Sequence, residues 1–584
     1  MVVAAVEVTA REPHEQGRSF GDAGPYEVRR LRVGYRVDPA HPANRSIVDL
    51  EHAAVDRDGH VTFAGDVLEF RPRSPERGNG RLLVDVVNRG RPTAFRFLCQ
   101  ERSVTVPPPP LPAIGDGWLL HQGWTIWCVG WQFDVDHPSL IGLDAPEARP
   151  GGRPPVGPVD YTAQPPADTD RLRLALPGHR PARPLPDGPA TMWATGADGL
   201  VFDEVPTDAW SFDPNGRYAR KTGGFAAGRR YRIRYTTEGS PVAGCGLLAL
   251  RDATSWARAE YGLSTSVLFG ASQCGRVIRQ VLADGLVHDE DGGAVYDGVM
   301  PLIAGARLGQ FNRRFANPGI LPVDTEGLEG PPTYGALLAG LPEADRPKVM
   351  ALNTSAEYWR GDAALAHEPP SAIGDTSVRV HFAAGTQHSP GVVPQEFTDP
   401  VFGTTGALGF STVDYGPLNR GLLAQLVAWI GGEAEPAPGT APPPEELTDR
   451  ATVLAAMAAL GWPVPEADSF GLPAGPVPPV DADGNERGGI RMPDIAVPLG
   501  AHTGWNVRHP SCGAPDFQLL LKGATRWFPP DEIERRHPDG DAGRQRGVEA
   551  VLDRLVADRF VLDTDRGRLR AAATEHWNES LSHQ

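Results

Sequence analysis

The chain has 584 residues with a formal net charge of -17 at neutral pH, and 40% of its residues are hydrophobic and 8% aromatic. This content is typical of a folded globular protein, and the length predicts one large catalytic unit with added or inserted pieces. The negative charge would repel phosphate backbones and anionic lipid, so we expect no nucleic acid and no membrane as partners. A small-molecule substrate is the partner that fits, and a homo-oligomer stays open.

The beginning of the chain and its cysteines predict the compartment. The first residues lack the basic start and long apolar core of a signal peptide, and no run of about 18 apolar residues follows that could span a membrane. The five cysteines are scattered, odd in number and without CxxC pairs. They indicate neither a disulfide framework nor a zinc site. We therefore expect a cytoplasmic protein with reduced thiols, no metal and no cofactor.

The first part of the chain predicts β-structure followed by a parallel sheet. Short apolar runs alternate with turn residues up to about residue 77, which is typical of hairpins. Arg81–Val87 is a largely apolar run, as expected of a buried strand, and Asn88-Arg89-Gly90 follows it. A helical stretch at Gly117–Gln122 leads into a second such strand at Trp124–Gly130. Strand, helix and strand in succession indicate a parallel sheet.

A region rich in Pro, Arg and short β-like runs interrupts this alternation at about residues 140–240, and we interpret it as an insertion with its own strands. The alternation then resumes. The expected elements are a helix at Gly246–Tyr261, a strand at Ser266–Phe269, a helix to about Asp284, strands at 298–303, 348–353 and 378–384, and a helix at Leu423–Ile430. A Pro-rich linker at 435–444 precedes a C-terminal region of helices and loops. We predict N-terminal β-structure at 1–78, a catalytic domain at 79–435 and a C-terminal region at 445–584.

The segment Leu268–Arg276 has the pattern of a sharp turn from a strand into a helix with a serine at its tip. Such a turn needs small neighbours, because the serine takes a strained backbone conformation. Gly270 and Gly275 supply them around Ser272. The usual pattern has glycine two residues after the serine, where this chain has Cys274. The segment predicts a nucleophile in an α/β-hydrolase fold, and on its own it also fits a structural turn.

An acid and a histidine follow Ser272 in the chain order that this fold uses, each just beyond a predicted parallel strand. Glu357 follows the strand that ends at Asn353, and His388 follows the strand that ends at Ala384. We therefore predict that Ser272 attacks a carbonyl group, with His388 as general base and later acid. Glu357 is expected to orient the histidine.

Other assignments of these roles stay open in the sequence. Glu357 could pair with Arg360 instead, in which case Asp362 or Asp375 could be the acid. Cys274 could be a thiol nucleophile, although the residue two past the serine usually faces packing. His388 could be an ordinary polar residue of a loop.

Backbone amides near Ser272 are expected to stabilise an oxyanion. The turn places Ser272 at a helix N-terminus, where the amide of Gln273 can donate and the helix dipole favours negative charge. The second donor in this fold comes from the loop after an early strand, and Asn88, Arg89 and Gly90 are the candidates. Structural turns explain these loop residues nearly as well.

Residues after the next strand are expected to contact the substrate. Trp131 and Gln132 follow that strand directly. The tryptophans in this part of the chain could line a cleft, although burial in the core is the commoner fate of such residues. They are Trp118, Trp124, Trp127 and Trp131.

Two further motifs are interpreted as structural. Gly244–Ala249 matches a dinucleotide-binding pattern, but no buried strand precedes it. Asp481–Glu486 looks like a calcium loop, but its glycine falls at the fourth position rather than near the sixth. We expect a tight turn there.

Several short motifs spread over most of the chain resemble those of the bacterial alpha/beta hydrolase domain proteins. They are Gly24-Pro25-Tyr26-Glu27, Asn88-Arg89-Gly90, Gly130-Trp131-Gln132, Arg251-Asp252, Gly270-Ala271-Ser272-Gln273, Phe311-Asn312 with Arg314-Phe315-Ala316, Glu357-Tyr358-Trp359, and Asp483-Gly484-Asn485-Glu486 followed by Gly504-Trp505-Asn506. The resemblance implies an α/β-hydrolase fold, with a mostly parallel sheet flanked by helices. It also implies a C-terminal region folded back on the catalytic unit. It implies no particular substrate.

A more distant resemblance is to glucuronoyl esterases, which have a small residue before the serine and a cation four residues after it. Arg276 has that position here, so the resemblance implies a contact of Arg276 with a substrate carboxylate or hydroxyl groups. Those esterases have an arginine directly after the serine, where this chain has Gln273.

Together these features predict a serine hydrolase that cleaves a carboxylic ester or lactone through an acyl-enzyme. Acyl transfer is the nearest alternative, because an acyl-enzyme can react with any nucleophile that outcompetes water. A lyase or cyclase of secondary metabolism on the same fold is a further alternative. A binding protein without activity is the third.

Overall fold

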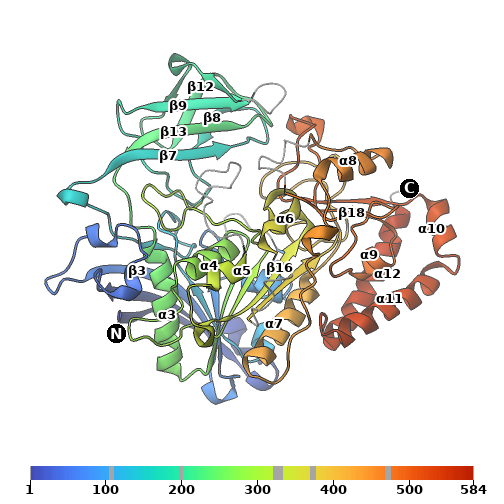
Figure 1. The fold of residues 1–584 in the computed structure, drawn as a ribbon, viewed down its shortest axis with the longest axis horizontal. Helices are drawn as coiled ribbons and strands as arrows, with labels where there is room; N and C mark the ends of the chain where they lie inside the picture. Colours follow the sequence, from blue (N-terminus) through green and yellow to red (C-terminus); the bar gives the residue numbers. More distant parts are fainter. Residues whose placement is uncertain are drawn as a thin grey trace. The chain divides into compact units, whose positions relative to one another are not determined.

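The computed structural model of the chain describes residues 2–103, 109, 111–195, 202–319, 333–367, 377–466 and 475–582 (Figure 1). The chain divides into two units. The first comprises Met1–Pro301, Leu308–Pro331 and Ala336–Pro347, and the second comprises Leu302–Arg307, Pro332–Gly335 and Lys348–Gln584. The three segments predicted from the sequence, 1–78, 79–435 and 445–584, stay a prediction.

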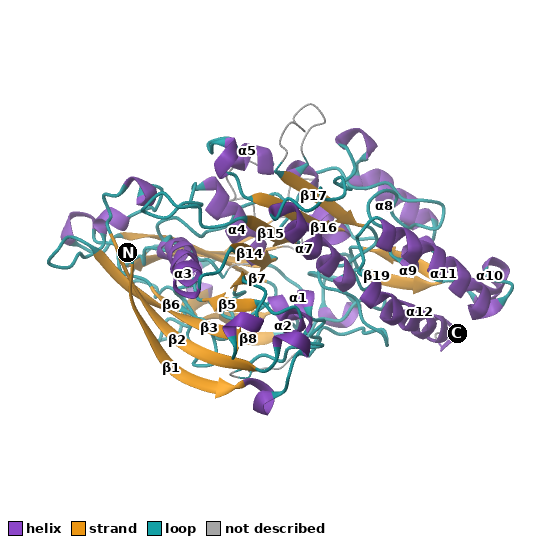
Figure 2. Cartoon of the chain, turned by 90° about the horizontal axis from the view of Figure 1, so that it is seen from below, coloured by secondary structure: helices purple, strands orange, loops and turns teal. Residues whose placement is uncertain are grey.

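The main sheet of the first unit combines antiparallel and parallel strands in the order β1-β2-β3-β5-β4-β14-β15, with β6 paired to β3. Their bounds are β1 Val3–Pro13, β2 Tyr26–Val37, β3 Val61–Pro72, β4 Arg81–Val86, β5 Thr125–Val129, β6 Leu143–Asp144, β14 Thr265–Ala271 and β15 Gly298–Leu302. The N-terminal strands pair antiparallel up to β5 and lie side by side in Figure 2, whereas β5, β4 and β14 pair in parallel. The predicted N-terminal hairpins and buried strands are confirmed.

The helices of the first unit, over the described residues, are α1 Ala94–Leu98, α2 Trp118–His121, α3 Cys245–Tyr261 and α4 Gln273–Ala283, and the residues of the short helix α5 Tyr334–Leu338 are divided between the two units. Helix α3 begins inside the segment that matches a dinucleotide-binding pattern. A Cβ on Gly246 would lie 2.0 Å from the carbonyl oxygen of Trp131. Close packing of the helix against that loop therefore explains this glycine, as the structural interpretation expected.

The insertion forms two small sheets with their own core, drawn together in Figure 1. One sheet has the order β10-β9-β13-β7 and the other β11-β12-β8. The strands are β7 Val156–Ala163, β8 Thr169–Arg173, β9 Ala190–Thr195, β10 Phe202–Val205, β11 Trp210–Phe212, β12 Tyr218–Phe225 and β13 Tyr231–Glu238. Alternate residues of β13, Tyr231, Ile233 and Tyr235, are buried in this core, as the period of two in a strand requires.

The second unit contains the parallel pair β16 and β17 and most of the C-terminal helices. Their bounds are β16 Lys348–Thr354, α6 Ser355–Arg360, β17 Val378–Ala383, α7 Gly416–Ile430, α8 Arg450–Ala459, α9 Pro493–Ala496, β18 Gly500–Thr503, β19 Ala524–Trp527, α10 Pro530–Arg536, α11 Gly540–Ala557 and α12 Arg566–Ser582. Helices α11 and α12 pack against each other (Figure 2). In the part of the chain that the structure describes, no helix has the length and apolar character needed to cross a membrane.

Two sequence predictions for this unit need correction. Helix α7 was expected from Leu423 and instead begins at Gly416, because Pro417 occupies a first-turn position where its missing N–H costs nothing. The C-terminal region was expected to hold only helices and loops, yet β18 and β19 form an antiparallel pair. Both strands have only four residues and lack a clear alternation of apolar side chains, so the sequence gives no strand signal.

Candidate active site

Ser272 lies at the junction of β14 and α4 with a strained backbone, φ 63° and ψ -121°. A non-glycine residue in such a conformation costs about 1–3 kcal/mol and persists only where the surrounding structure enforces it. The tight turn also excludes side chains nearby, since a Cβ on Gly270 would lie 2.7 Å from the carbonyl oxygen of Cys274. A strained serine at a strand-to-helix turn has the geometry of a nucleophile elbow.

Cys274 is a packing residue in this turn. Its side chain is fully buried, and burial raises the pKa of its thiol well above the ordinary value. A thiol reacts as a nucleophile through its thiolate, which burial suppresses. The geometry therefore favours Ser272 over Cys274 as the reacting group.

Gln273 is the first residue of α4, and the helix leaves its backbone N–H without an intrahelical acceptor. Its side-chain amide donates to the carbonyl oxygen of Pro318 at 2.5 Å. The backbone N–H and the dipole of α4 together favour negative charge beside Ser272.

The loop after β4 makes a tight turn at Asn88, Arg89 and Gly90. Arg89 and Gly90 both have positive φ, 51° and 79°, and Asn88 and Arg91 exchange backbone hydrogen bonds of 2.8 and 3.0 Å. The side-chain amide of Asn88 donates to the carbonyl oxygen of Ala271 at 3.3 Å. This bond ties the loop to the residue directly before Ser272.

Arg89 brings a positive charge to this loop. Burial lowers the pKa of its guanidinium to about 10, so the group stays charged at neutral pH. It donates to the side-chain oxygen of Asn88 at 2.8 Å and to the carbonyl oxygen of Gly319 at 3.4 Å. The cation would strengthen any hydrogen bond from this loop to an oxyanion.

Asp85, which no sequence motif marks, holds the residues that directly follow this loop. Its carboxylate accepts hydrogen bonds from the backbone N–H groups of Thr93 and Ala94 at 2.7 and 3.0 Å, and from the Thr93 hydroxyl at 2.9 Å. Burial raises the pKa of Asp85 to about 6 in spite of these bonds. A single acid inside an otherwise apolar strand was the available sequence signal, because a buried carboxyl needs partners.

Trp131, Gln132 and Arg276 are mostly buried and bonded within the protein. The Trp131 indole N–H donates to the Val87 carbonyl oxygen at 2.7 Å. Gln132 donates to the Asp134 carboxylate at 2.7 Å, and Arg276 donates to the Leu308 carbonyl oxygen at 3.3 Å. A substrate contact of Trp131 would therefore use its ring rather than its N–H.

A pocket of about 180 Å³ lies in the first unit, and it is linked to Gln132 through Asp134 and to Gln273 through Pro318. Its walls include Asp134, Glu147, Arg180 and Pro318, the residue that Gln273 contacts. Burial raises the pKa of Asp134 to about 6. Ligand sites usually measure about 300–1,000 Å³, so this pocket has room for one polar group rather than a whole ligand.

Glu357 and His388 form a close pair in the second unit. Nδ1 of His388 lies 2.5 Å from Oε1 of Glu357. The other carboxylate oxygen of Glu357 accepts hydrogen bonds from the backbone N–H and the hydroxyl of Thr354, which forms a capping box at the start of α6. The Tyr415 hydroxyl donates to the His388 carbonyl oxygen at 2.6 Å. Glu357 and His388 are thus each held by further hydrogen bonds, in addition to the contact between them.

The alternative acids have other surroundings. Asp362 is buried and forms an ion pair with the partly exposed Arg307. Asp375 lies outside the described residues. Of the candidates that the structure describes, Glu357 is therefore the one that meets the histidine.

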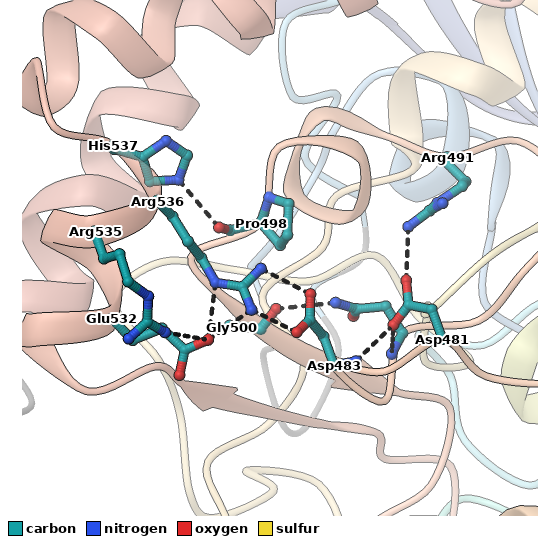
Figure 3. A network of polar contacts seen from close by, with 10 residues as sticks. Asp481, Asp483, Arg491, Pro498, Gly500, Glu532, Arg535, Arg536 and His537 are labelled. Atoms are coloured by element: carbon teal, nitrogen blue, oxygen red, sulfur yellow. Dashed lines mark hydrogen bonds and ion pairs between the residues drawn. The ribbon is translucent and has the colours of Figure 1, made fainter.

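The turn that resembles a calcium loop uses its carboxylates internally (Figure 3). Asp481 accepts hydrogen bonds from the backbone N–H groups of Asp483 and Asn485, both at 3.0 Å, and Asp483 pairs with Arg536. Over the described ranges of the chain, no three His, Cys, Asp or Glu residues gather as ligands for a metal ion. The tight turn predicted from the sequence is confirmed.

A comparison with known protein families agrees with this fold. A sequence model described as "Alpha/beta hydrolase domain" matches residues 232–571, more than half of the chain. None of the curated proteins matches. Two solved structures of a glucuronoyl esterase from Solibacter usitatus are similar at 10% identity, with TM-scores of 0.25 and 0.26, over 62% of this chain and 72% and 71% of theirs. The matched range contains Ser272, Glu357, His388 and the C-terminal turn at Asp481–Glu486.

Proposed function

The chain belongs to the alpha/beta hydrolase domain family, and on this premise we propose that it is a serine hydrolase of a small carboxylic ester or lactone. The observation that carries the proposal is the strained backbone of Ser272 between β14 and α4. Strain of this kind is retained where it serves a function, and at this turn it presents the serine hydroxyl at the helix N-terminus.

In the proposed reaction, Oγ of Ser272 attacks the carbonyl carbon of the ester while Nε2 of His388 takes the hydroxyl proton. Glu357, bonded to Nδ1 of His388, fixes the tautomer and stabilises the imidazolium that forms. The tetrahedral intermediate collapses to an acyl-enzyme, and the leaving alcohol takes the proton from His388. Water then attacks the acyl group with His388 again as base, which releases the carboxylic acid and restores Ser272.

The carbonyl oxygen carries the negative charge in both steps. We assign its stabilisation to the backbone N–H of Gln273 and to the loop of Asn88, Arg89 and Gly90. Support comes from the hydrogen bond that ties Asn88 to the residue before Ser272. Removing one oxyanion donor typically costs about 100- to 1,000-fold in kcat.

The polar residues of the first unit are proposed to bind the rest of the substrate. Arg276, Trp131 and Gln132 are the proposed contacts, and the pocket with Asp134 in its wall would take one polar substituent. Cations and carboxyl groups together suit hydroxyl groups better than a purely apolar chain. The reaction itself needs neither a metal nor an organic cofactor.

Labelling with a fluorophosphonate tests the mechanism, because the reagent reacts only with an activated serine. We expect labelling of Ser272 and turnover of p-nitrophenyl acetate, both abolished by Ser272→Ala. Loss of such a nucleophile lowers kcat by about 10⁶-fold. Cys274→Ala is the matched control at the same turn and should still be labelled.

Folded protein that is not labelled would refute the serine mechanism. Labelled protein that cleaves no simple ester would favour acyl transfer or non-hydrolytic chemistry instead. Loss of p-nitrophenyl acetate turnover in Cys274→Ala together with its retention in Ser272→Ala would transfer the nucleophile role to the thiol.

A further inference from the structure

Glu486 bridges the start of α6, which carries Glu357, and the loop that carries His388. Its Oε1 accepts a hydrogen bond from the Ser355 hydroxyl at 2.5 Å, and its Oε2 accepts one from the backbone N–H of Gly385 at 2.7 Å. Ser355 is the first residue of α6, and Gly385 opens the segment that leads to His388. One carboxylate from the C-terminal region thus connects the acid to the histidine.

Several hydrogen bonds and ion pairs hold the turn that carries Glu486 in place (Figure 3). Arg491 donates to Asp481 at 3.3 Å, and Arg536 of α10 holds Asp483. The side-chain amide of Asn485 bonds to the backbone of β18 through its nitrogen at 3.2 Å and through its oxygen at 2.9 Å. The position of Glu486 is therefore also fixed by contacts within the C-terminal region, in addition to the two bonds that it makes to Ser355 and Gly385.

The C-terminal region also approaches the start of α6 closely at Gly504. A Cβ on Gly504 would lie 2.3 Å from the Ser355 hydroxyl oxygen and 2.4 Å from the backbone nitrogen of Ala356. Next along the chain, the Trp505 ring packs at 5.8 Å from the Trp359 ring of α6. Two motifs of the C-terminal region, Asp483–Glu486 and Gly504–Asn506, therefore converge on the start of α6.

Packing alone does not explain a carboxyl group at this place. Glu486 is 3% exposed, and burial raises the pKa of its carboxyl group to about 7 in spite of the bonds from Ser355, Gly385 and Trp359. Burying a carboxyl group costs free energy that an apolar side chain of similar size would not cost. The presence of a carboxyl group here points to a geometric task that needs two hydrogen-bonding atoms in fixed positions.

We propose that Glu486 is a positioning residue, which holds the start of α6 and the loop of His388 at the separation that the hydrogen bond between Glu357 and Nδ1 of His388 requires. The inference rests on the proposed function of Ser272, Glu357 and His388. Misplacing a catalytic group by about 1 Å can cost about 100-fold in rate, so a bridge that fixes two segments affects kcat without touching the substrate. It gives the C-terminal region a part in catalysis.

Two substitutions separate the bridge from the negative charge. Glu486→Gln keeps the shape, and its oxygen can still accept from Gly385 while its NH₂ group donates to the Ser355 hydroxyl, which can rotate to accept. Glu486→Ala removes both bonds. A bridging role predicts rescue by glutamine, because the protonated acid has the same arrangement of donor and acceptor.

The experiment measures p-nitrophenyl acetate hydrolysis by the full chain, with kcat normalised to the folded fraction from tryptophan fluorescence. We expect Glu486→Ala to lower kcat about 10- to 100-fold with KM within about twofold, the usual size of such supporting contacts. Glu486→Gln should stay within about threefold of the wild type. Asp565→Asn is the matched control, since this buried acid pairs with Arg420 instead.

If folded Glu486→Ala keeps the wild-type kcat, or if Glu486→Gln loses as much of its kcat as Glu486→Ala, the inference on Glu486 is overturned while the proposed function stands. If Glu486→Ala fails to fold, Ser355→Ala removes one arm of the bridge and should lower kcat about fivefold at unchanged KM. An unchanged kcat there would again overturn it. Wild-type protein without labelling or turnover would overturn the proposed function and this inference together.

Discussion

The two units of the chain hold the residues of the proposed mechanism in different ways. In the first unit, Ser272 is set by its immediate neighbours, since the conformation of the turn depends on Gly270 and on the helix that begins at Gln273. In the second unit, Glu357 lies in the first turn of α6 and His388 in a loop, each after a strand, and a third segment that carries Glu486 joins them. One part is local in sequence, and the other is assembled from distant segments.

This difference determines which substitutions disrupt the geometry of each part. A local turn is damaged by changes within a few residues of it and tolerates changes elsewhere. An assembled pair depends on contacts spread over more than a hundred residues, so it is sensitive to the C-terminal region as a whole. The predictions below test this contrast, beginning with the largest expected effect.

The largest effect is expected at the acid of the second unit. Glu357→Gln should lower kcat about 10⁴-fold at nearly constant KM, because an amide favours the wrong tautomer of His388 and no longer stabilises the imidazolium. The measurement is the steady-state hydrolysis of p-nitrophenyl acetate.

Asp362→Asn is the control for that substitution. Asp362 has a positive φ of 49°, which asparagine tolerates, and its partner is Arg307 rather than a histidine. We expect a lower unfolding midpoint from the lost ion pair, with kcat per folded molecule within about threefold of the wild type. The opposite ranking of the two variants would transfer the acid role to Asp362.

The second effect concerns the local turn of the first unit. Gly270→Ala places a Cβ 2.7 Å from the Cys274 carbonyl oxygen and 3.0 Å from the Cys274 Cβ, so the backbone around Ser272 must shift. We expect the rate of fluorophosphonate labelling to fall about 100-fold. Gly340→Ala, with no atom within 4 Å of the added Cβ, should label at the wild-type rate. Equal rates in the two variants would mean that the turn is not under steric constraint.

The same contrast explains what the sequence could predict. The elbow was recognisable because its small residues and serine are adjacent, and the parallel strands were recognisable as apolar runs. The pairing of Glu357 with His388 followed from strand order alone. A local signal for the acid also existed, since Thr354 and Glu357 have the spacing of a capping box.

The hydrogen bonds by which Glu486 bridges Ser355 and Gly385 could not be predicted from the sequence. Its partners Ser355 and Gly385 lie about a hundred residues away, and nothing in the spacing of the motif that carries Glu486 names them. The resemblance to a family marked this motif without giving it a task. Long-range hydrogen bonds of this kind depend on tertiary packing, which no periodicity encodes.

The smallest effect is on stability and involves a buried ion pair of the second unit. Nδ1 of His576 lies 2.7 Å from the Asp494 carboxylate. Burial opposes both charges, but the pairing prevails: it raises the pKa of His576 and holds the pKa of Asp494 well below its usual range. Its contribution to stability is fully present below about pH 6.5 and is lost as the pH rises through the raised pKa of His576.

We therefore expect the urea concentration at the unfolding midpoint of the wild type to decrease as the pH is raised from 7 to 9. The loss is about 1.4 kcal/mol for each unit by which the folded pKa of His576 exceeds the unfolded one. The buried acids Asp85, Asp134 and Asp252 of the first unit have raised pKa values of about 6, so their ionisation is largely complete in this range.

The control is the double variant Asp494→Asn with His576→Gln, which keeps polar side chains at both positions without the charges. Its midpoint should change less between pH 7 and pH 9 than that of the wild type, because the pair no longer binds a proton more tightly in the folded state, whereas the raised pKa values of Glu486 and of the buried Cys274 thiol act equally in both proteins. His502 has a pKa lowered to about 4 by burial, so it is neutral throughout this range. An equal loss in both proteins would place the alkaline sensitivity outside this pair and remove the contrast between the two units at high pH.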